Sequence, residues 1–502
     1  MPLEPIFEDI NLTQRKGNVK ERIKVECKTD LPSASISKIL NVTTRTAISR
    51  VETTDKEVLY EGKAIFFICY QNEEGQIAKC ECGTEFKGEI KTQEGYNCRA
   101  MVFSSVEKTE ADISGVRLVV NGYICLDAHL TECKKINVLT GGEELITDGK
   151  EIEYVKGYGL RESTFTLEEE FEIDCKVQDV LSQRAEATVT AVQCGVGCII
   201  VDGEVLLSAI LLQNRDKNDI IRENKILPFR AEIECEDAMP SMSATAYVRE
   251  KSFKTDISVD EESSKSQVTA SIILALSGEA FSNELLTVVS DAFSTKEDLE
   301  LEKEKHCFQR PCDIRSDAKE ITVSASTDSL PVGTTLVANI GEKAEVLEVL
   351  CQEDGLEVKG ILTLTAFFKD SENKIFARKL ESPFETIISC ICEKDCEYNV
   401  QVCAHKAKAR LISETEIELT AKLFFTAYPY EKCSLDLVKG VKSLGEKPKN
   451  THAISIYIPC EGEELWSLAK RLNVCPETLV NTNQDLQFPL SGKERIVVYR
   501  QK

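Results

Sequence analysis

The clearest pattern along the chain is an apolar run that a single glycine interrupts near its start, and this pattern occurs three times. The runs cover residues 58–70, 200–212 and 357–368, with their glycines at Gly62, Gly203 and Gly360. A polar segment follows each run. Because internal repeats determine architecture more strongly than local propensities do, the pattern predicts three related structural units.

A second landmark, a phenylalanine, follows each glycine at nearly the same distance along the chain. These residues are Phe86, Phe229 and Phe384. Each unit then closes with a long segment of alternating apolar and polar residues, from 116 onward, at 268–276 and at 417–425. Such alternation is typical of half-buried strands, and short strands separated by glycines and polar clusters are typical of β-sandwiches. The isolated glycines are best explained as bulges or as positions where the backbone relaxes.

The last fifty residues follow a different pattern. Residues 452–459 alternate like a strand, whereas Leu465, Leu468, Ala469 and Leu472 recur at helical spacing. Pro476 suits the first turn of a second short helix, and residues 495–499 form a final apolar run. The expected order is strand, helix, helix, strand.

We therefore expect a mainly β protein with three tandem β-sandwich-like domains and a small βααβ domain. The expected boundaries are 1–135 for the first domain with an N-terminal arm, 136–160 for a connector, 161–293 for the second domain, 294–312 for a charged linker, 313–438 for the third domain, 439–451 for a flexible linker and 452–502 for the last domain. The charged helix formers at 294–305 favour a linker or a short solvated helix. The Gly, Pro, Ser and Lys residues at 439–450 favour a tether.

Composition supports several domains and limits the kinds of chemistry. A chain of 502 residues is too long for one core, and it has no apolar run of about 18 residues that would span a membrane. Residues 1–20 lack the pattern of a secretory signal, so we expect a cytoplasmic protein whose 21 cysteines act mostly as small buried hydrophobic residues. Without any CxxC pair and with four histidines, we expect no metal site and no other cofactor.

The net charge of −24 disfavours a nucleic-acid partner, because phosphate binding requires clustered lysine and arginine. A solvated acidic surface is the simplest explanation of the charge, and a basic protein partner is the alternative. The sequence contains no phosphate-binding glycine loop. Cys403 and His405 are the best local candidates for nucleophilic catalysis, but two-residue spacing is common in ordinary strands. We therefore expect a protein that is not an enzyme.

Residues 452–499 resemble a LysM module. The segment from Tyr457 to Trp466 is similar to the LysM opening Y-x-V-x-x-G-D-[TS]-L-W, with Glu463 and Glu464 in place of the usual Asp and Thr or Ser. LysM modules commonly bind N-acetylglucosamine polymers such as peptidoglycan and chitin through the loops at this opening and at a later asparagine. The resemblance implies a binding site for a partner or a glycan. Its residues are Gly462, Glu463, Glu464, Leu465, Trp466 and Asn483.

The three long repeats resemble SPOCS domains, which are named for spore-coat association. Residues 31–40 are similar to the motif LP-x-x-x-x-I-x-x-I-L, and residues 176–181 and 333–337 are similar to it more loosely. SPOCS repeats followed by a LysM module are typical of SipL-type spore coat morphogenetic proteins of Clostridia. This resemblance covers nearly the whole chain.

The resemblance implies a structural role in sporulation. Proteins of this type lie in the mother-cell cytoplasm at the forespore surface, where they take part in coat and cortex assembly and bind SpoIVA-like morphogenetic ATPases. It implies that the LysM region makes this protein–protein interaction, while self-association through sheet edges is a further physical option. The alternative function is that of a glycan-binding protein. The sequence leaves the binding surface, the oligomeric state and cysteine cross-linking open.

Overall fold

A computed structural model describes residues 4–30, 36–54, 56–92, 98–114, 117–260, 265–312, 314–372, 374–389, 396–448 and 454–499. Its described part is mainly β, as the alternating pattern predicts. The first unit contains β1 (Glu4–Asp30), β2 (Ile36–Thr53), β3 (Glu57–Asn72), β4 (Ile77–Lys91), β5 (Cys98–Ser114) and β6 (Arg117–Glu143).

The second and third units repeat this order, each with one additional leading strand. The second contains β7 (Ile146–Gly157), β8 (Arg161–Ile173), β9 (Asp179–Cys194), β10 (Cys198–Asn214), β11 (Asp219–Glu234), β12 (Ser243–Asp260) and β13 (Lys265–Phe293). The third contains β14 (Glu297–Pro311), β15 (Arg315–Ser326), β16 (Thr335–Gln352), β17 (Gly355–Lys369), β18 (Ile375–Ile388), β19 (Cys396–Leu411) and β20 (Glu416–Glu446).

Each unit is a sandwich of two antiparallel three-stranded layers. In the first unit, β2-β3-β4 faces β1-β6-β5. In the second, β9-β10-β11 faces β8-β13-β12, and in the third, β16-β17-β18 faces β15-β20-β19. The central strand of each first layer carries the glycine-interrupted apolar run, and its alternate residues fill the space between the layers. The expectation of three sandwich-like units and a small terminal βααβ domain is therefore confirmed.

The repeated glycine makes room for the repeated phenylalanine. Gly62 pairs directly with Phe86, and a Cβ atom added at Gly62 would lie 2.5 Å from the Phe86 ring. The glycines of the other repeats face Phe229 and Phe384 at similarly short distances. Because such contacts are impossible for a side chain, only glycine fits. The expected bulge does occur, but in the neighbouring strand, where Ser49, Thr190 and Leu347 are the extra residues.

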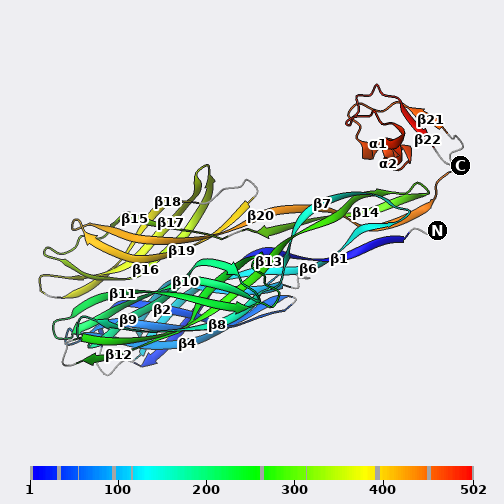
Figure 1. Cartoon of the computed structure of the whole chain (residues 1–502). Helices are drawn as coiled ribbons and strands as arrows, with labels where there is room; N and C mark the ends of the chain where they lie inside the picture. The colour runs from blue at the N-terminus through cyan, green and yellow to red at the C-terminus, as the bar shows by residue number, and fades with distance from the viewer. Residues whose placement is uncertain are drawn as a thin grey trace.

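Each unit extends into a long two-stranded ribbon. Residues 4–15 of β1 pair with 131–143 of β6, β7 pairs with the end of β13, and β14 pairs with the end of β20. Figure 1 shows the three ribbons running together away from the sandwiches, towards the C-terminal domain. The expected connector at 136–160 is therefore wrong, because most of this segment belongs to β6 and β7.

The expected linkers at 294–312 and 439–451 are also wrong, because most of their described residues form strands that pair with each other. Apolar Leu299 and Leu301 alternate with acidic residues, which is a strand period that the helix-forming composition obscures. The basic residues of one segment neutralise the acidic residues of the other. Lys439 lies 2.9 Å from Glu304, and Lys442 lies 3.9 Å from Glu300.

The three units surround a common pseudo-threefold axis. Cys69, Ile210 and Phe367, which occupy the same position relative to their repeat glycines, meet in one apolar cluster. The ribbons meet in two further clusters, to which all three units contribute. Tyr154 and Leu437 belong to the first of these clusters, and Leu139 and Val438 to the second. The three repeated units of the chain are thus arranged like the subunits of a trimer, and we refer to this arrangement as the internal trimer.

The terminal domain consists of β21 (Ile454–Tyr457), α1 (Leu465–Leu472), α2 (Pro476–Thr482) and β22 (Ile496–Tyr499), as the sequence predicts. Its core contains Leu468, Leu472 and Ile496, together with Phe293 from the tip of the second ribbon. This shared cluster attaches the domain to the ribbon end (Figure 1). Among the described residues, no helix is long and apolar enough to cross a membrane.

Candidate functional site

The most exposed apolar surface of the terminal domain lies on its two-stranded sheet. β21 and β22 pair Ile454 with Tyr499 and Ile456 with Val497, so these four side chains share the face opposite the helices. Ile454, Ile456 and Tyr499 are 60%, 65% and 54% exposed, and Ile458 beyond the strand is 71% exposed. Large aliphatic side chains grouped on one face are a common feature of protein-binding surfaces. We refer to these five residues as the outer sheet face.

The loop before α1 carries the first three residues of the predicted site, and the fourth, Leu465, begins the helix. Gly462 adopts a φ of 80°, which favours glycine, and its N–H donates to the Leu490 carbonyl over 2.7 Å. Glu463 accepts two hydrogen bonds from Arg471, at 2.8 and 2.9 Å, which hold the pKa of its carboxyl below the ordinary range. Glu464 is exposed at the start of α1, and Leu465 packs partly against the domain core.

Trp466, the only tryptophan of the chain, attaches the terminal domain to the second ribbon. Its indole N–H donates to Asp291 of β13 over 2.9 Å, and its ring packs edge-on against Phe293 at 5.3 Å. Lys470 also donates to Asp291, at 2.7 Å. Burial alone would raise the pKa of Asp291, but the hydrogen bonds from Lys470 and Trp466 lower it. The Asn473 amide adds a hydrogen bond to the Thr295 carbonyl at 2.8 Å.

Asn483 stabilises the terminal domain internally. Its amide nitrogen donates to the carbonyls of Leu479 and Val497, at 2.9 and 2.8 Å, and its amide oxygen accepts the Val497 N–H at 2.7 Å. Both donors and the oxygen therefore have partners that join α2 to β22. The structure thus brings the predicted site residues into one small domain, but commits the polar atoms of Glu463, Trp466 and Asn483 to contacts within the chain.

A second candidate site lies on the pseudo-threefold axis, where the sandwiches enclose a cavity of ≈950 Å³ lined by residues of all three units. Arg184 keeps 37% of its side-chain surface accessible and is one of the lining residues. Four arginines gather around this cavity in a chain that is acidic as a whole. They are Arg45, Arg184, Arg222 and Arg249.

A cyclic set of contacts links the units around this cavity. Arg45 of the first unit donates to the Phe253 carbonyl of the second at 3.4 Å, and Lys343 of the third donates to the Val106 carbonyl of the first at 3.0 Å. The equivalent residue of the second unit is Glu186. Burial and the Glu186 carboxylate raise the pKa of the Cys403 thiol in the third unit. Arg45, Glu186 and Lys343 thus hold equivalent positions, which carry a cation in the first and third units and an anion in the second.

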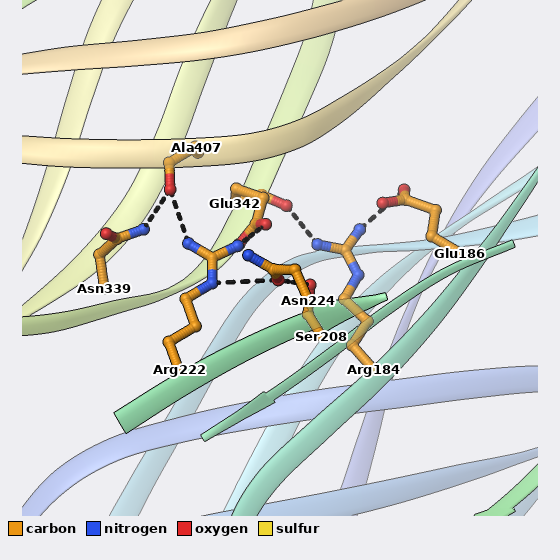
Figure 2. Close-up of polar contacts among 8 residues, drawn as sticks. All are labelled: Arg184, Glu186, Ser208, Arg222, Asn224, Asn339, Glu342 and Ala407. Atoms are coloured by element: carbon orange, nitrogen blue, oxygen red, sulfur yellow. Dashed lines mark hydrogen bonds and ion pairs between the residues drawn. The ribbon is translucent and has the colours of Figure 1, made fainter. Parts of the chain in front are cut away.

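The most deeply buried ionic contact joins the second and third units (Figure 2). The Arg222 guanidinium bonds the Glu342 carboxylate, and these side chains are only 10% and 3% exposed. Arg222 also donates to the Ala407 carbonyl at 2.7 Å, and Arg184 donates to the Glu342 carbonyl. Buried charges require this many partners to offset lost hydration. The cluster therefore fixes how the two units fit together.

Cys403 and His405 do not form the nucleophilic pair considered from the sequence. His405 is fully buried, and its ring packs against Phe424 in a tilted arrangement, with 4.4 Å between the ring centres. Neither ring nitrogen has a hydrogen-bond partner within the described part of the chain. Burial, followed by the nearby charge of Lys422, lowers the pKa of His405 to about 4. A buried thiol with a raised pKa and a histidine without a hydrogen bond lack the geometry of an activated nucleophile.

No His, Cys, Asp and Glu residues within the described ranges form a group of three or more that could hold a metal ion. The cysteines that the structure describes are free thiols, of which Cys307, Cys351 and Cys460 are exposed. Comparisons with family models, curated proteins and solved structures found no match to this chain.

Sequence reasoning missed both the outer sheet face and the axial cavity. The alternation of Ile454, Ile456 and Ile458 could have indicated the first, because a two-stranded sheet covered by helices on one face leaves the other open. The cavity had no comparable signal. Arg184 and Glu342 come from strands of different units, and only the trimeric arrangement brings them together.

Proposed function

We propose that this chain is a structural protein of spore envelope assembly that binds a SpoIVA-like ATPase through its C-terminal module. The observation that carries the proposal is the outer sheet face, where Ile454, Ile456, Ile458 and Tyr499 stay exposed, whereas the polar atoms of Trp466 and Asn483 bond within the chain. An exposed aliphatic face suits a protein partner better than a polar sugar chain. The resemblance to SPOCS and LysM domains supplies the spore context.

The body of the molecule suits a scaffold. Three sandwiches and three ribbons share apolar clusters around one axis, and the module is attached at the ribbon end through Phe293. A rigid body of this kind would hold the module at a fixed distance from the sandwiches. On this proposal the protein lies at the forespore surface in the mother cell, with its sandwiches available for contacts with other coat components or with copies of itself.

The test is capture of a purified SpoIVA-like ATPase by the full-length chain. Deleting 449–502 removes the module but keeps β20 intact, and capture should be lost. Ile456→Arg places a charge in the centre of the outer sheet face, and capture should fall at least tenfold with unchanged circular dichroism. Val480→Arg is the matched control, because Val480 is 40% exposed on α2, outside that face. Undiminished capture by the Ile456→Arg variant would contradict the proposal.

The glycan alternative requires free polar groups in the loops. Asn483 has none to offer, because its amide is fully hydrogen-bonded inside the domain. Titration of the full-length chain with chitin oligomers or muropeptides tests this function directly. Saturable binding that Ile456→Arg leaves unchanged would favour the glycan function over the protein partner.

A further inference from the structure

The second sandwich contains a partly open cavity of ≈220 Å³. All six strands from β8 to β13 contribute to its walls. Most of the wall is apolar, including Phe171, Leu207, Leu211, Phe253 and Val268. Leu207 and Leu211, which both line the cavity, belong to two apolar clusters that share a contact with Phe171.

The cavity arises from smaller side chains at repeated core positions. Leu211 occupies the place that Tyr70 has in the first unit and Phe368 in the third, counted from the repeat glycines. In the third unit, Phe368 stacks on Phe376 at 5.5 Å and lies in the same cluster as the rest of the core. A leucine in place of an aromatic ring leaves more space at this position. The repeat architecture therefore does not require this cavity.

The rim of the cavity also differs from the other repeats. Glu223 and Lys225 of β11 line it and share the strand face of the inward-pointing Leu227 and Phe229. Relative to the repeat phenylalanines, the position of Lys225 corresponds to Cys82 in the first unit and Leu380 in the third. Both of these residues contribute to apolar cores. A charge at this position is thus a feature of the second unit.

Lys225 lies at this rim and forms no ion pair with a carboxylate among the described residues. Its ammonium lies 5.4 Å from the centre of the Phe171 ring, which is a cation–π contact. The nearby Glu172 and Asp174 carboxylates both pair with Lys265 at 3.1 Å. Burial, followed by the Asp174 charge, raises the pKa of Glu223.

We propose that the second sandwich binds a small aliphatic carboxylate, with its chain in the cavity and its carboxylate beside Lys225. The size is suitable, since an apolar cavity of about 150 Å³ in another protein binds benzene. A short acyl chain would fill the space between Leu207 and Leu211, and its carboxylate would accept a hydrogen bond from the Lys225 ammonium. This binding is independent of the C-terminal module.

Isothermal titration of the full-length chain with sodium octanoate, octan-1-ol and octylamine tests the proposal. Octanoate should bind most tightly and octylamine most weakly. Leu211→Phe restores the aromatic ring of the other repeats and should weaken octanoate binding at least tenfold. Lys225→Leu should weaken octanoate binding about fivefold, as expected for a solvent-accessible ion pair, and leave octan-1-ol binding unchanged.

Phe368→Leu is the matched control, because it alters the equivalent position in the third unit and should leave octanoate binding unchanged. Thermal unfolding of each variant establishes that it is folded, and Ala209→Ile serves as a second cavity-filling change. No octanoate binding at millimolar concentration would overturn the proposal. Undiminished binding by both cavity-filling variants, or octylamine binding as tight as octanoate binding, would overturn it as well.

Discussion

The pseudo-threefold axis passes through two sections that are held together by different forces. Between the ribbons, the three units meet through apolar side chains such as Leu139, Val289 and Val438, each about 1% exposed. Between the sandwiches, an apolar cluster that includes Cys69, Ile210 and Phe367 is joined by a cavity bordered by arginines and carboxylates. Apolar contacts are tolerant of small shifts, whereas buried ion pairs tolerate only one arrangement. We therefore expect the ribbon contacts to contribute mainly stability, and the axial polar cluster to restrict how the sandwiches fit together.

The strongest test of this contrast removes a carboxylate from the polar section. Glu342→Ala leaves the Arg222 guanidinium buried without its anionic partner, which should lower the free energy of unfolding by about 4 kcal/mol. Urea denaturation of the full-length chain measures this change. Replacing both residues, as Arg222→Met with Glu342→Leu, should recover most of the loss, because buried ion pairs add little net stability.

Glu372→Ala provides the control for this prediction, because Glu372 forms an exposed pair with Lys374. Removing that pair should change the free energy of unfolding by less than about 1 kcal/mol. If Glu342→Ala and Glu372→Ala lower the free energy of unfolding equally, the buried ion pair does not restrict how the second and third units fit together.

The corresponding change in the ribbon section is Leu139→Ala. Leu139 is 1% exposed among side chains from all three ribbons, so truncation should lower the free energy of unfolding by about 3 kcal/mol. Unlike Glu342→Ala, the Leu139→Ala variant should leave no buried charge. No second substitution of a charged partner should therefore recover the lost stability. Val438→Ala in the same cluster should behave similarly, and a loss below about 1 kcal/mol in both variants would show that the ribbons contribute little.

Acid should destabilise the folded chain through the buried His405. The pKa of His405 is lowered to about 4 in the folded chain, whereas an unfolded histidine has an ordinary pKa near 6.5. As pH falls from 6.5 to 4, the unfolded state therefore binds a proton that the folded state does not, and stability is lost over this range. The stability lost through His405 reaches about 3 kcal/mol only at pH 4.

His405→Phe removes this titration and keeps an aromatic ring against Phe424. Its free energy of unfolding should vary less between pH 7 and pH 4 than that of the unaltered chain. Parallel pH profiles for the two proteins would show that the carboxylates, and not His405, determine the acid response.

The repeated landmarks were sufficient to predict the sandwiches. A glycine such as Gly62 and a phenylalanine such as Phe86 face each other in the same way in each unit, and this local packing requirement is visible in the sequence. The ribbons are not evident from the sequence, because the composition of segment 294–305 favours a helix. The alternation of Leu299 and Leu301 with acidic residues is typical of a strand. The lysines that pair with these acids lie far along the chain, so the sequence does not indicate the pairing.

The trimeric arrangement could not be predicted, because Cys69, Ile210 and Phe367 look like ordinary strand residues until the units are placed together. For the C-terminal module, the sequence located the predicted site residues in one domain. It could not indicate that Trp466 contacts Asp291 or that Asn483 bonds β22, because these contacts depend on tertiary structure.

The attachment of the module to the ribbon end combines both kinds of contact, with Phe293 apolar and Asp291 charged. Asp291→Ala removes the acceptor of the Trp466 indole and of Lys470, but leaves the apolar contact, so overall stability should fall by only about 1 kcal/mol. The fluorescence of the single tryptophan should shift to longer wavelength and become easier to quench with acrylamide. Asp256→Ala, in an exposed pair with Lys254, should change neither property. If Trp466 fluorescence is the same in the Asp291→Ala variant, packing against Phe293 keeps the indole in place without the Asp291 hydrogen bond, as apolar packing does between the ribbons.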